Sequence, residues 1–275
     1  MTRTLDLPDL SDMLKISLLP LLAALVLMAS PVHAMPGMGS GEGGGMGDKF
    51  GQMDTNKDGK VSREEFKAAF PNMREEAFVA IDKDGDGFIC REIRADGSDC
   101  FERYDPTSTG PNLLPWVELT YYRQFGDIDR LHKVFPALCA YAKWWRLNRT
   151  WPDGTYWSSG WGTGMDNMPR VKPEYNPIFS HGHMVWLDTN LQQMLVDESL
   201  LNIGFYIERW QEIEDMEDEM KRLRAYVNEH LWDERTAFLY DRYGDGTLCT
   251  TKGIGAFWAL QADALDKERL DRMVA

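Results

Sequence analysis

The chain has 275 residues, 43% of them hydrophobic and 12% aromatic, which is enough for one large folded domain or two smaller ones. Its formal net charge is -14 and no basic patch is evident, so the composition argues against a nucleic-acid-binding protein. An acidic surface suits an exported protein and the binding of hard cations.

Residues 1–34 are predicted to be an export signal. Residues 16–28 form an apolar run that is too short to span a bilayer comfortably, and the tripeptide VHA at residues 32–34 is an acceptable cleavage site. Aspartates disturb the positive flank expected before this run, but Lys15 supplies it if translation starts at Met13. The alternative is an uncleaved membrane anchor. We therefore expect an exported protein, periplasmic or extracellular, with no stable membrane span after cleavage.

Residues 35–47 are rich in Gly and Met and are predicted to be a flexible linker. Thioethers favour Cu(I), so Met35, Met38 and Met46 also suggest a copper site. No His or Cys in this stretch supports such a site, which favours the linker.

Four cysteines follow the linker: Cys90, Cys100, Cys139 and Cys249. Disulfides are permitted in an exported chain, but the spacing does not choose among the possible pairings. The absence of a CxxC pair argues against structural zinc or a redox motif. Disulfides and free buried thiols both stay open.

Residues 54–65 read DTNKDGKVSREE and have the spacing of an EF-hand calcium loop. Calcium takes about six to eight oxygen ligands, and this spacing wraps them round one ion. Gly59 allows the sharp turn at the sixth position. The predicted ligands are Asp54, Asn56, Asp58, the backbone carbonyl of Lys60, and the bidentate Glu65. The sequence therefore predicts a Ca²⁺ site here.

A second loop begins with Asp82, Asp84 and Asp86, which are also predicted metal ligands. Its closing position holds Ile93, and the nearby Glu92 stands one place early. A weak or empty second site, retained as the structural partner of the first, is therefore expected. Together the two loops define an EF-hand pair of helix-loop-helix units over residues 48–95.

Residues 96–275 are predicted to be an all-α region of helical hairpins, because apolar residues recur there at helical spacing. Asp127 is expected to cap a helix after a break at Gly126. The charged face of the stretch 211–231 is expected to be solvated, and residues 236–246 to be extended with a turn. The expected helices lie at 111–126, 128–147, 188–209, 211–231, 253–265 and from Lys267 onward.

A loop over residues 151–177 is rich in Trp, Gly and Pro. Its glycines at 160, 162 and 164 argue against a helix, and its tryptophans are too apolar for disorder. Within it, residues 160–170 contain one carboxylate, Asp166, which a folded loop would present beside aromatic faces, as a sugar-cleaving site needs. The alternative is an aspartate that only caps the loop.

Four blocks follow one another in the second part of the chain: DPTSTGPNLLPW (105–116), WPDGTYWSSGWGTGMDNMPR (151–170), LWDERTAFLYDR (231–242) and KGIGAFWAL (252–260). With these blocks, the sequence from about residue 87 onward resembles the catalytic domains of glycoside hydrolase family 63, especially the mannosylglycerate-hydrolase-like and glucosidase-like members. Residues 87–93, GFICREI, resemble the same pattern, which would explain why the second calcium loop loses its closing glutamate.

The resemblance implies an (α/α)6 barrel and inverting cleavage of an α-glycosidic bond, with Asp166 as the general acid. Surrounding aromatics would hold up the pKa of Asp166. Trp157 and Trp161 would stack on sugar faces. Asn167 and Arg170 would bind hydroxyl groups or orient the acid, or Arg170 would instead lower its pKa.

Two departures from the family are expected to matter. The family's general base is a glutamate near the C-terminal end of its domain, and we find no corresponding block in residues 96–275. The first part of the barrel is also lacking. We therefore expect a partial (α/α)6 barrel with exposed apolar surface, poor solubility or self-association.

Two functions stay open. The first is an exported, calcium-binding glycoside hydrolase, or a fragment of one, that cleaves an oligosaccharide or small glycoside. The second is a calcium-binding EF-hand protein with a carbohydrate-binding or interaction domain that lacks catalysis.

Overall fold

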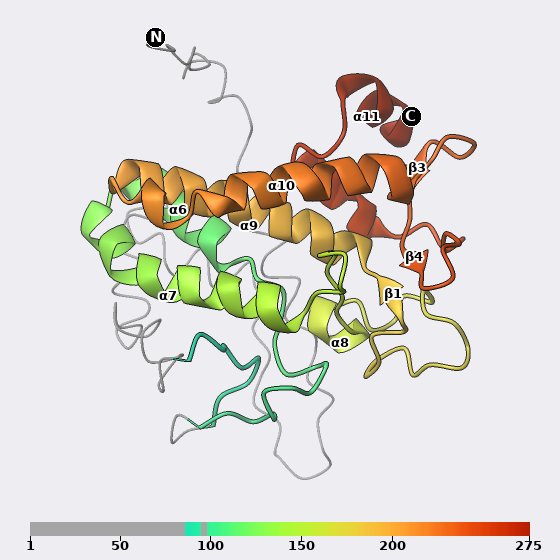
Figure 1. Cartoon of the computed structure of the whole chain (residues 1–275), viewed down its shortest axis with the longest axis horizontal. Helices are drawn as coiled ribbons and strands as arrows, with labels where there is room; N and C mark the ends of the chain where they lie inside the picture. The colour runs from blue at the N-terminus through green and yellow to red at the C-terminus, as the bar shows by residue number, and fades with distance from the viewer. Residues whose placement is uncertain (1–85, 95–97) are drawn as a thin grey trace, which may run out of the picture. The chain divides into compact units, whose positions relative to one another are not determined.

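The structure is a computed structural model that describes residues 86–94 and 98–275 (Figure 1). The predicted export signal, linker and first calcium loop lie outside the described residues. No helix in the described part is long and apolar enough to cross a membrane. The helices are α6 (Leu114–Phe125), α7 (Ile128–Asn148), α8 (Gly160–Thr163), α9 (Leu187–Tyr206), η1 (Trp210–Glu212), α10 (Asp215–Tyr226), η2 (Val227–Leu231), η3 (Ile254–Leu260) and α11 (Lys267–Val274).

The short strands form two antiparallel pairs. Strand β1 (Met184–Val185) pairs with β4 (Arg242–Tyr243), and β2 (Trp232–Asp233) pairs with β3 (Phe238–Leu239). The turn predicted after β4 is present, because Gly246 has φ 88° and its N–H donates to Tyr243 O. The predicted all-α class is confirmed, with strand pairs confined to the connections between helices.

The hairpin of α6 and α7 forms where its sequence signals predict. Gly126 ends α6 in the left-handed region, at φ 69°, where a residue with a side chain would be strained. The Asp127 side chain then accepts a hydrogen bond from Arg130 N at 3.2 Å and caps α7. The apolar stripe of α7 is buried, including Leu131 and Phe135 at 0% exposure.

Helix α9 lies at the centre of the described fold. It packs against α6, α7, α10 and η3, and Leu191, Met194 and Ile203 are completely buried on it. In chain order α6 and α7 form one contacting pair, and α9 and α10 form another (Figure 1). The predicted all-α array of helical hairpins is thus confirmed.

Two predicted helices are shorter than expected. The stretch 211–231 is divided into η1, α10 and the π-helical turn η2, and the stretch 253–265 forms only η3. A tight reversal after α9 accounts for the first break. A Cβ on Gly204 would lie 2.9 Å from Ile213 Cδ1 and 3.2 Å from Trp210 Cα, so the returning chain touches α9 there.

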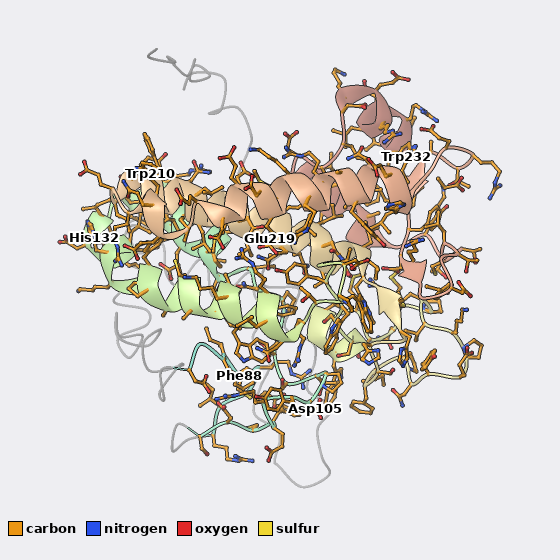
Figure 2. The ribbon with its side chains drawn as sticks, in the orientation of Figure 1. Phe88, Asp105, His132, Trp210, Glu219 and Trp232 are labelled. Carbon is orange, nitrogen blue, oxygen red and sulfur yellow. The ribbon has the colours of Figure 1, made fainter. Side chains whose placement is uncertain are left out.

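Helix α10 carries a buried charge that the sequence places on a solvated face. Glu219 is 3% exposed, accepts from Arg146 Nε at 2.7 Å, and accepts from Tyr156 Oη at 2.6 Å. Figure 2 shows Glu219 on the side of α10 that faces α7. Nearby, burial raises the pKa of Asp197 well above its usual value, and Gln193 donates to it at 2.8 Å. The prediction of a fully solvated face is therefore wrong at Glu219.

Of the two alternatives for the cysteines, disulfides or free thiols, the structure has free thiols. Cys90, Cys139 and Cys249 are buried and Cys100 is half-buried, and all four are free. Burial raises the pKa of the Cys139 thiol to about 12, as expected for an inert sulfhydryl in an apolar environment.

Candidate active site

The loop over residues 151–177 carries Asp166 and is called the acid loop below. It lies between α7 and α9 and contains one unexpected turn of helix. The glycines argued against helix here, but α8 spans Gly160–Thr163. Ser159 caps it by accepting from Gly162 N at 3.0 Å, and Gly164 ends it at φ 70°. Gly160 has a packing role, because a Cβ there would overlap the backbone oxygen of Pro177.

Asp166 and Asn167 occupy the tip of the turn that follows α8. Met168 N donates to Met165 O at 3.1 Å, and Met165 N donates to Gly160 O at 3.1 Å, which fixes the turn. Asp166 is half-buried and Asn167 is exposed. No described residue forms a hydrogen bond or ion pair with the Asp166 carboxylate, so the carboxylate is available to a ligand.

The two predicted sugar platforms each have a guanidinium over one ring face. Arg91 Cζ lies 4.3 Å from the ring centroid of Trp161, which is 37% exposed. Arg149 Cζ lies 4.8 Å from the ring centroid of Trp157, which is half-buried. These are cation–π distances. At most one face of each indole is left for stacking on a sugar, and the edge of Phe179 approaches Trp161 as well.

Arg170 does not contact Asp166 but is buried among two other carboxylates. Its Nη1 donates to Asp188 Oδ1 at 2.9 Å, its Nη2 binds Asp188 Oδ2, and its Nη1 lies 3.5 Å from Asp241 Oδ1. The guanidinium also stacks 4.5 Å from the ring centroid of Trp186. Burial lowers the pKa of Arg170, but the two carboxylates outweigh burial and the pKa is raised.

Asp188 and Asp241 are site residues that the sequence analysis did not select. Asp188 lies in the first turn of α9, and Asp241 lies between β3 and β4 and accepts from Leu187 N at 2.9 Å. Burial raises the pKa of Asp241 to about 6, and Arg170 opposes this rise. Asp241 lies within LWDERTAFLYDR, one of the blocks that carry the family resemblance, and this was the one sequence signal that could have identified it.

Further contacts hold the end of the acid loop against the segment after β4. Tyr243 Oη donates to Arg170 O at 2.8 Å, and Thr251 Oγ1 donates to Pro169 O at 2.9 Å. Strand β1, which precedes α9, also pairs with β4. The loop that carries Asp166 is thus fixed to residues more than 70 positions later in the chain.

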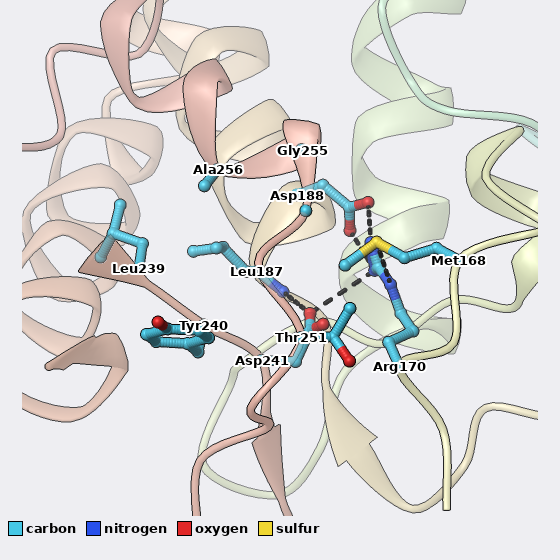
Figure 3. Close-up of a pocket in the computed structure, with 11 residues that line it drawn as sticks. Met168, Arg170, Leu187, Asp188, Leu239, Tyr240, Asp241, Thr251, Gly255 and Ala256 are labelled. Carbon is cyan, nitrogen blue, oxygen red and sulfur yellow. Dashed lines mark hydrogen bonds and ion pairs between the residues drawn. The ribbon is translucent and has the colours of Figure 1, made fainter. Parts of the chain in front are cut away.

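A small cavity with both polar and apolar lining lies beneath this part of the loop (Figure 3). It is partly open to solvent. Its walls combine residues of the acid loop, the start of α9 and the segment between β3 and η3, including Met168, Arg170, Asp188, Asp241, Thr251 and Gly253.

Of the predicted calcium ligands, only Asp86 is described. It accepts from Phe88 N at 2.8 Å, and its carboxylate pairs with Arg103. No group of three or more His, Cys, Asp or Glu side chains within 86–94 and 98–275 is arranged to hold a metal ion. The other predicted ligands lie outside the described residues: Asp54, Asn56, Asp58, Lys60, Glu65, Asp82 and Asp84.

The described fold is an array of helical hairpins with a long loop between α7 and α9. The family profile described as "Mannosylglycerate hydrolase MGH1-like glycoside hydrolase domain" matches residues 78–275, and the chain belongs to this family. An EF-hand profile matches residues 48–71. No curated protein matches the chain significantly.

Solved structures share the fold at low sequence identity. The GH63 mannosylglycerate hydrolase from Thermus thermophilus in complex with glucose is 18% identical, with a TM-score of 0.56 over 72% of this chain and 66% of that one. Its complex with Tris and D-glycerate is 17% identical, with a TM-score of 0.56 over 72% of this chain and 63% of that one. The chain therefore spans slightly less than two thirds of the length of these structures.

Removal of the Arg170 charge is expected to destabilise the fold strongly. Arg170→Met would leave Asp188 and Asp241 buried without their cation, which typically costs about 3–5 kcal/mol. Arg209→Met is the matched control, because Arg209 pairs with Glu212 at the surface and is expected to cost less than about 1 kcal/mol. Urea unfolding of both variants measures the difference, and equal losses would contradict the role given to Arg170.

Proposed function

We propose that this chain is an exported, calcium-binding glycoside hydrolase domain that cleaves an α-glycosidic bond with inversion and uses Asp166 as the general acid. The observation that carries the proposal is the position of Asp166. It lies at the tip of a fixed turn in the acid loop of a glycoside-hydrolase family member, with no protein partner among the described residues.

Asp166 would protonate the oxygen of the leaving group. Inversion also requires a carboxylate about 6.5–9.5 Å away that activates water. Asp188 does not suit this second role, because Arg170 binds both of its oxygens. We assign no general base among the described residues.

We propose an α-linked glucoside or mannoside as substrate, since the similar solved structures include a mannosylglycerate hydrolase bound to glucose. Trp157 and Trp161 would each stack one ring face on a sugar. The exposed amide of Asn167 would bind a hydroxyl beside the acid. Arg170 would act by anchoring the loop, since its guanidinium is occupied by Asp188 and Asp241.

Asp166→Asn is expected to lower hydrolysis of an α-glucoside or α-mannoside by about 10²-fold or more, because the amide cannot protonate the leaving oxygen. Glu174→Gln is the matched control, since Glu174 is an exposed carboxylate of the same loop. Initial rates of sugar release by the full-length chain measure both effects. Retained activity in Asp166→Asn would remove Asp166 from this role.

The wild-type chain itself decides between the two functions left open by the sequence. If it binds sugars but releases no product from any α-glucoside or α-mannoside, the non-catalytic carbohydrate-binding function replaces hydrolysis. The limited span of the chain relative to its structural neighbours makes this control necessary.

We also propose that residues 54–65 bind Ca²⁺, a proposal supported by the ligand spacing and the EF-hand profile over 48–71. Glu65→Gln is expected to weaken Ca²⁺ binding by at least about tenfold, because an amide cannot replace the bidentate carboxylate. Glu64→Gln, one position earlier, is the control. Calorimetric titration of the full-length chain with Ca²⁺ measures both, and unchanged affinity in Glu65→Gln would refute the assignment.

Export is the remaining part of the proposal, and the apolar run 16–28 with its cleavage site supports it. The mature chain is expected to begin at Met35. Intact-mass analysis of the protein recovered outside the cytoplasm measures this, and an uncleaved chain would favour the membrane anchor.

A further inference from the structure

The cavity of Figure 3 is lined by the carboxylate of Asp241, and one of its two oxygens receives no hydrogen bond from a described residue. Arg170, Asp188 and Asp241 are each 3% exposed or less. Both Asp188 oxygens bind Arg170, and Asp241 Oδ1 receives Leu187 N and lies near Arg170. No described residue donates a hydrogen bond to Asp241 Oδ2. This oxygen is not among the fully buried atoms without a partner, so it can accept a hydrogen bond from a group that enters the cavity.

The size of the cavity restricts that donor. The cavity has room for about one water molecule, which is also about the size of one hydroxyl group. The cluster combines one guanidinium with two carboxylates, so its net negative charge favours a hydrogen-bond donor. Thr251, which donates to Pro169 O, lines the same cavity and can accept a further hydrogen bond.

Met168 forms an adjustable wall of the cavity. Its Cε would overlap a Cβ placed on Gly253, so the thioether rests directly on the glycine backbone. Arg170 Nε also contacts Met168 Sδ at 3.3 Å. Methionine is unbranched and flexible, so this side chain sets the size of the cavity without rigid packing.

The cavity lies close to the proposed acid along the chain. Met168 follows Asp166 by two residues, which limits the distance between their Cα atoms to about 7 Å. We propose that Asp241 accepts a hydrogen bond from one hydroxyl group of the sugar ring bound at Asp166, and that Met168 limits the cavity to that single group. This inference rests on the proposed sugar site, but it concerns binding and not bond cleavage.

Binding of D-glucose and D-mannose tests the inference, because neither contains a glycosidic bond. Calorimetric titration of the full-length wild-type chain is compared with titrations using the monodeoxy analogues of each sugar. Loss of one particular hydroxyl is expected to weaken binding by about tenfold or more, as for a hydrogen bond to a charged group. The Asp241→Asn variant is expected to bind the parent sugar about tenfold more weakly than the wild type does. In this variant, removing the same hydroxyl should weaken binding little further.

Substitutions at Met168 test the size limit. The wild type is expected to reject the analogue that carries an O-methyl group on the recognised hydroxyl. Met168→Ala enlarges the cavity and should accept it, whereas Met168→Leu preserves the volume and should reject it. These three results together would support Met168 as the wall.

The pH dependence gives a readout that a purely structural role would not change. Since the pKa of Asp241 is raised to about 6, sugar binding should strengthen as pH rises through that value and Asp241 ionises. The charged and titratable groups around it are Arg170, Asp188, Tyr243 and Cys249. Asp241→Asn should remove this dependence.

Equal deoxygenation penalties in the wild type and Asp241→Asn would overturn the inference, and so would a failure of the wild type to bind either sugar. The assignment of the acid fails separately, because it is judged by hydrolysis in Asp166→Asn. If deoxygenation shows the expected pattern but Asp166→Asn does not lower hydrolysis, the assignment of the Asp241 site stands and the assignment of Asp166 as the acid is wrong.

Discussion

The buried contact of Arg170 with Asp188 and Asp241 is the interaction on which the site depends. It joins the end of the acid loop, the first turn of the central helix α9 and the segment after β3. Buried ion pairs rarely add much net stability, because desolvation offsets their attraction. Their geometry is nevertheless specific, since any displacement leaves a charge without a partner. The contact therefore fixes where the acid loop ends more than it stabilises the protein.

The helices were largely predictable because their signals are local. Gly126 and Asp127 mark the end of one helix and the start of the next within two positions, and the structure uses both as the sequence indicates. The partners of Arg170 were not predictable in the same way. They lie 18 and 71 residues away, and neither stands out by composition. Spacing along the chain carries no information on such contacts unless a family pattern supplies it.

The difference between local signals and contacts distant in the sequence also explains two wrong predictions, those for α8 and for Glu219. Gly160 and Gly162 lower helix propensity, yet α8 forms with Ser159 as its cap, and Pro177 and the Ser158 side chain leave no room for larger residues at the two glycines. Glu219 belongs to a charged stretch, yet it is buried because Arg146 and Tyr156 reach it from α7 and from the acid loop. In both cases a contact distant in the sequence overrides a local preference.

Under the proposed function, the guanidinium groups over Trp157 and Trp161 limit what these two side chains contribute to sugar binding. With one face of each indole covered, stacking supplies attraction from a single side and discriminates poorly between sugars that differ only in one hydroxyl. Discrimination then has to come from polar groups with fixed geometry. Asp241 meets this requirement, because Leu187 N and Arg170 hold one oxygen and direct the carboxylate while the other oxygen stays without a donor among the described residues. The contact that fixes the loop is thus also the one that prepares a hydroxyl acceptor beside it.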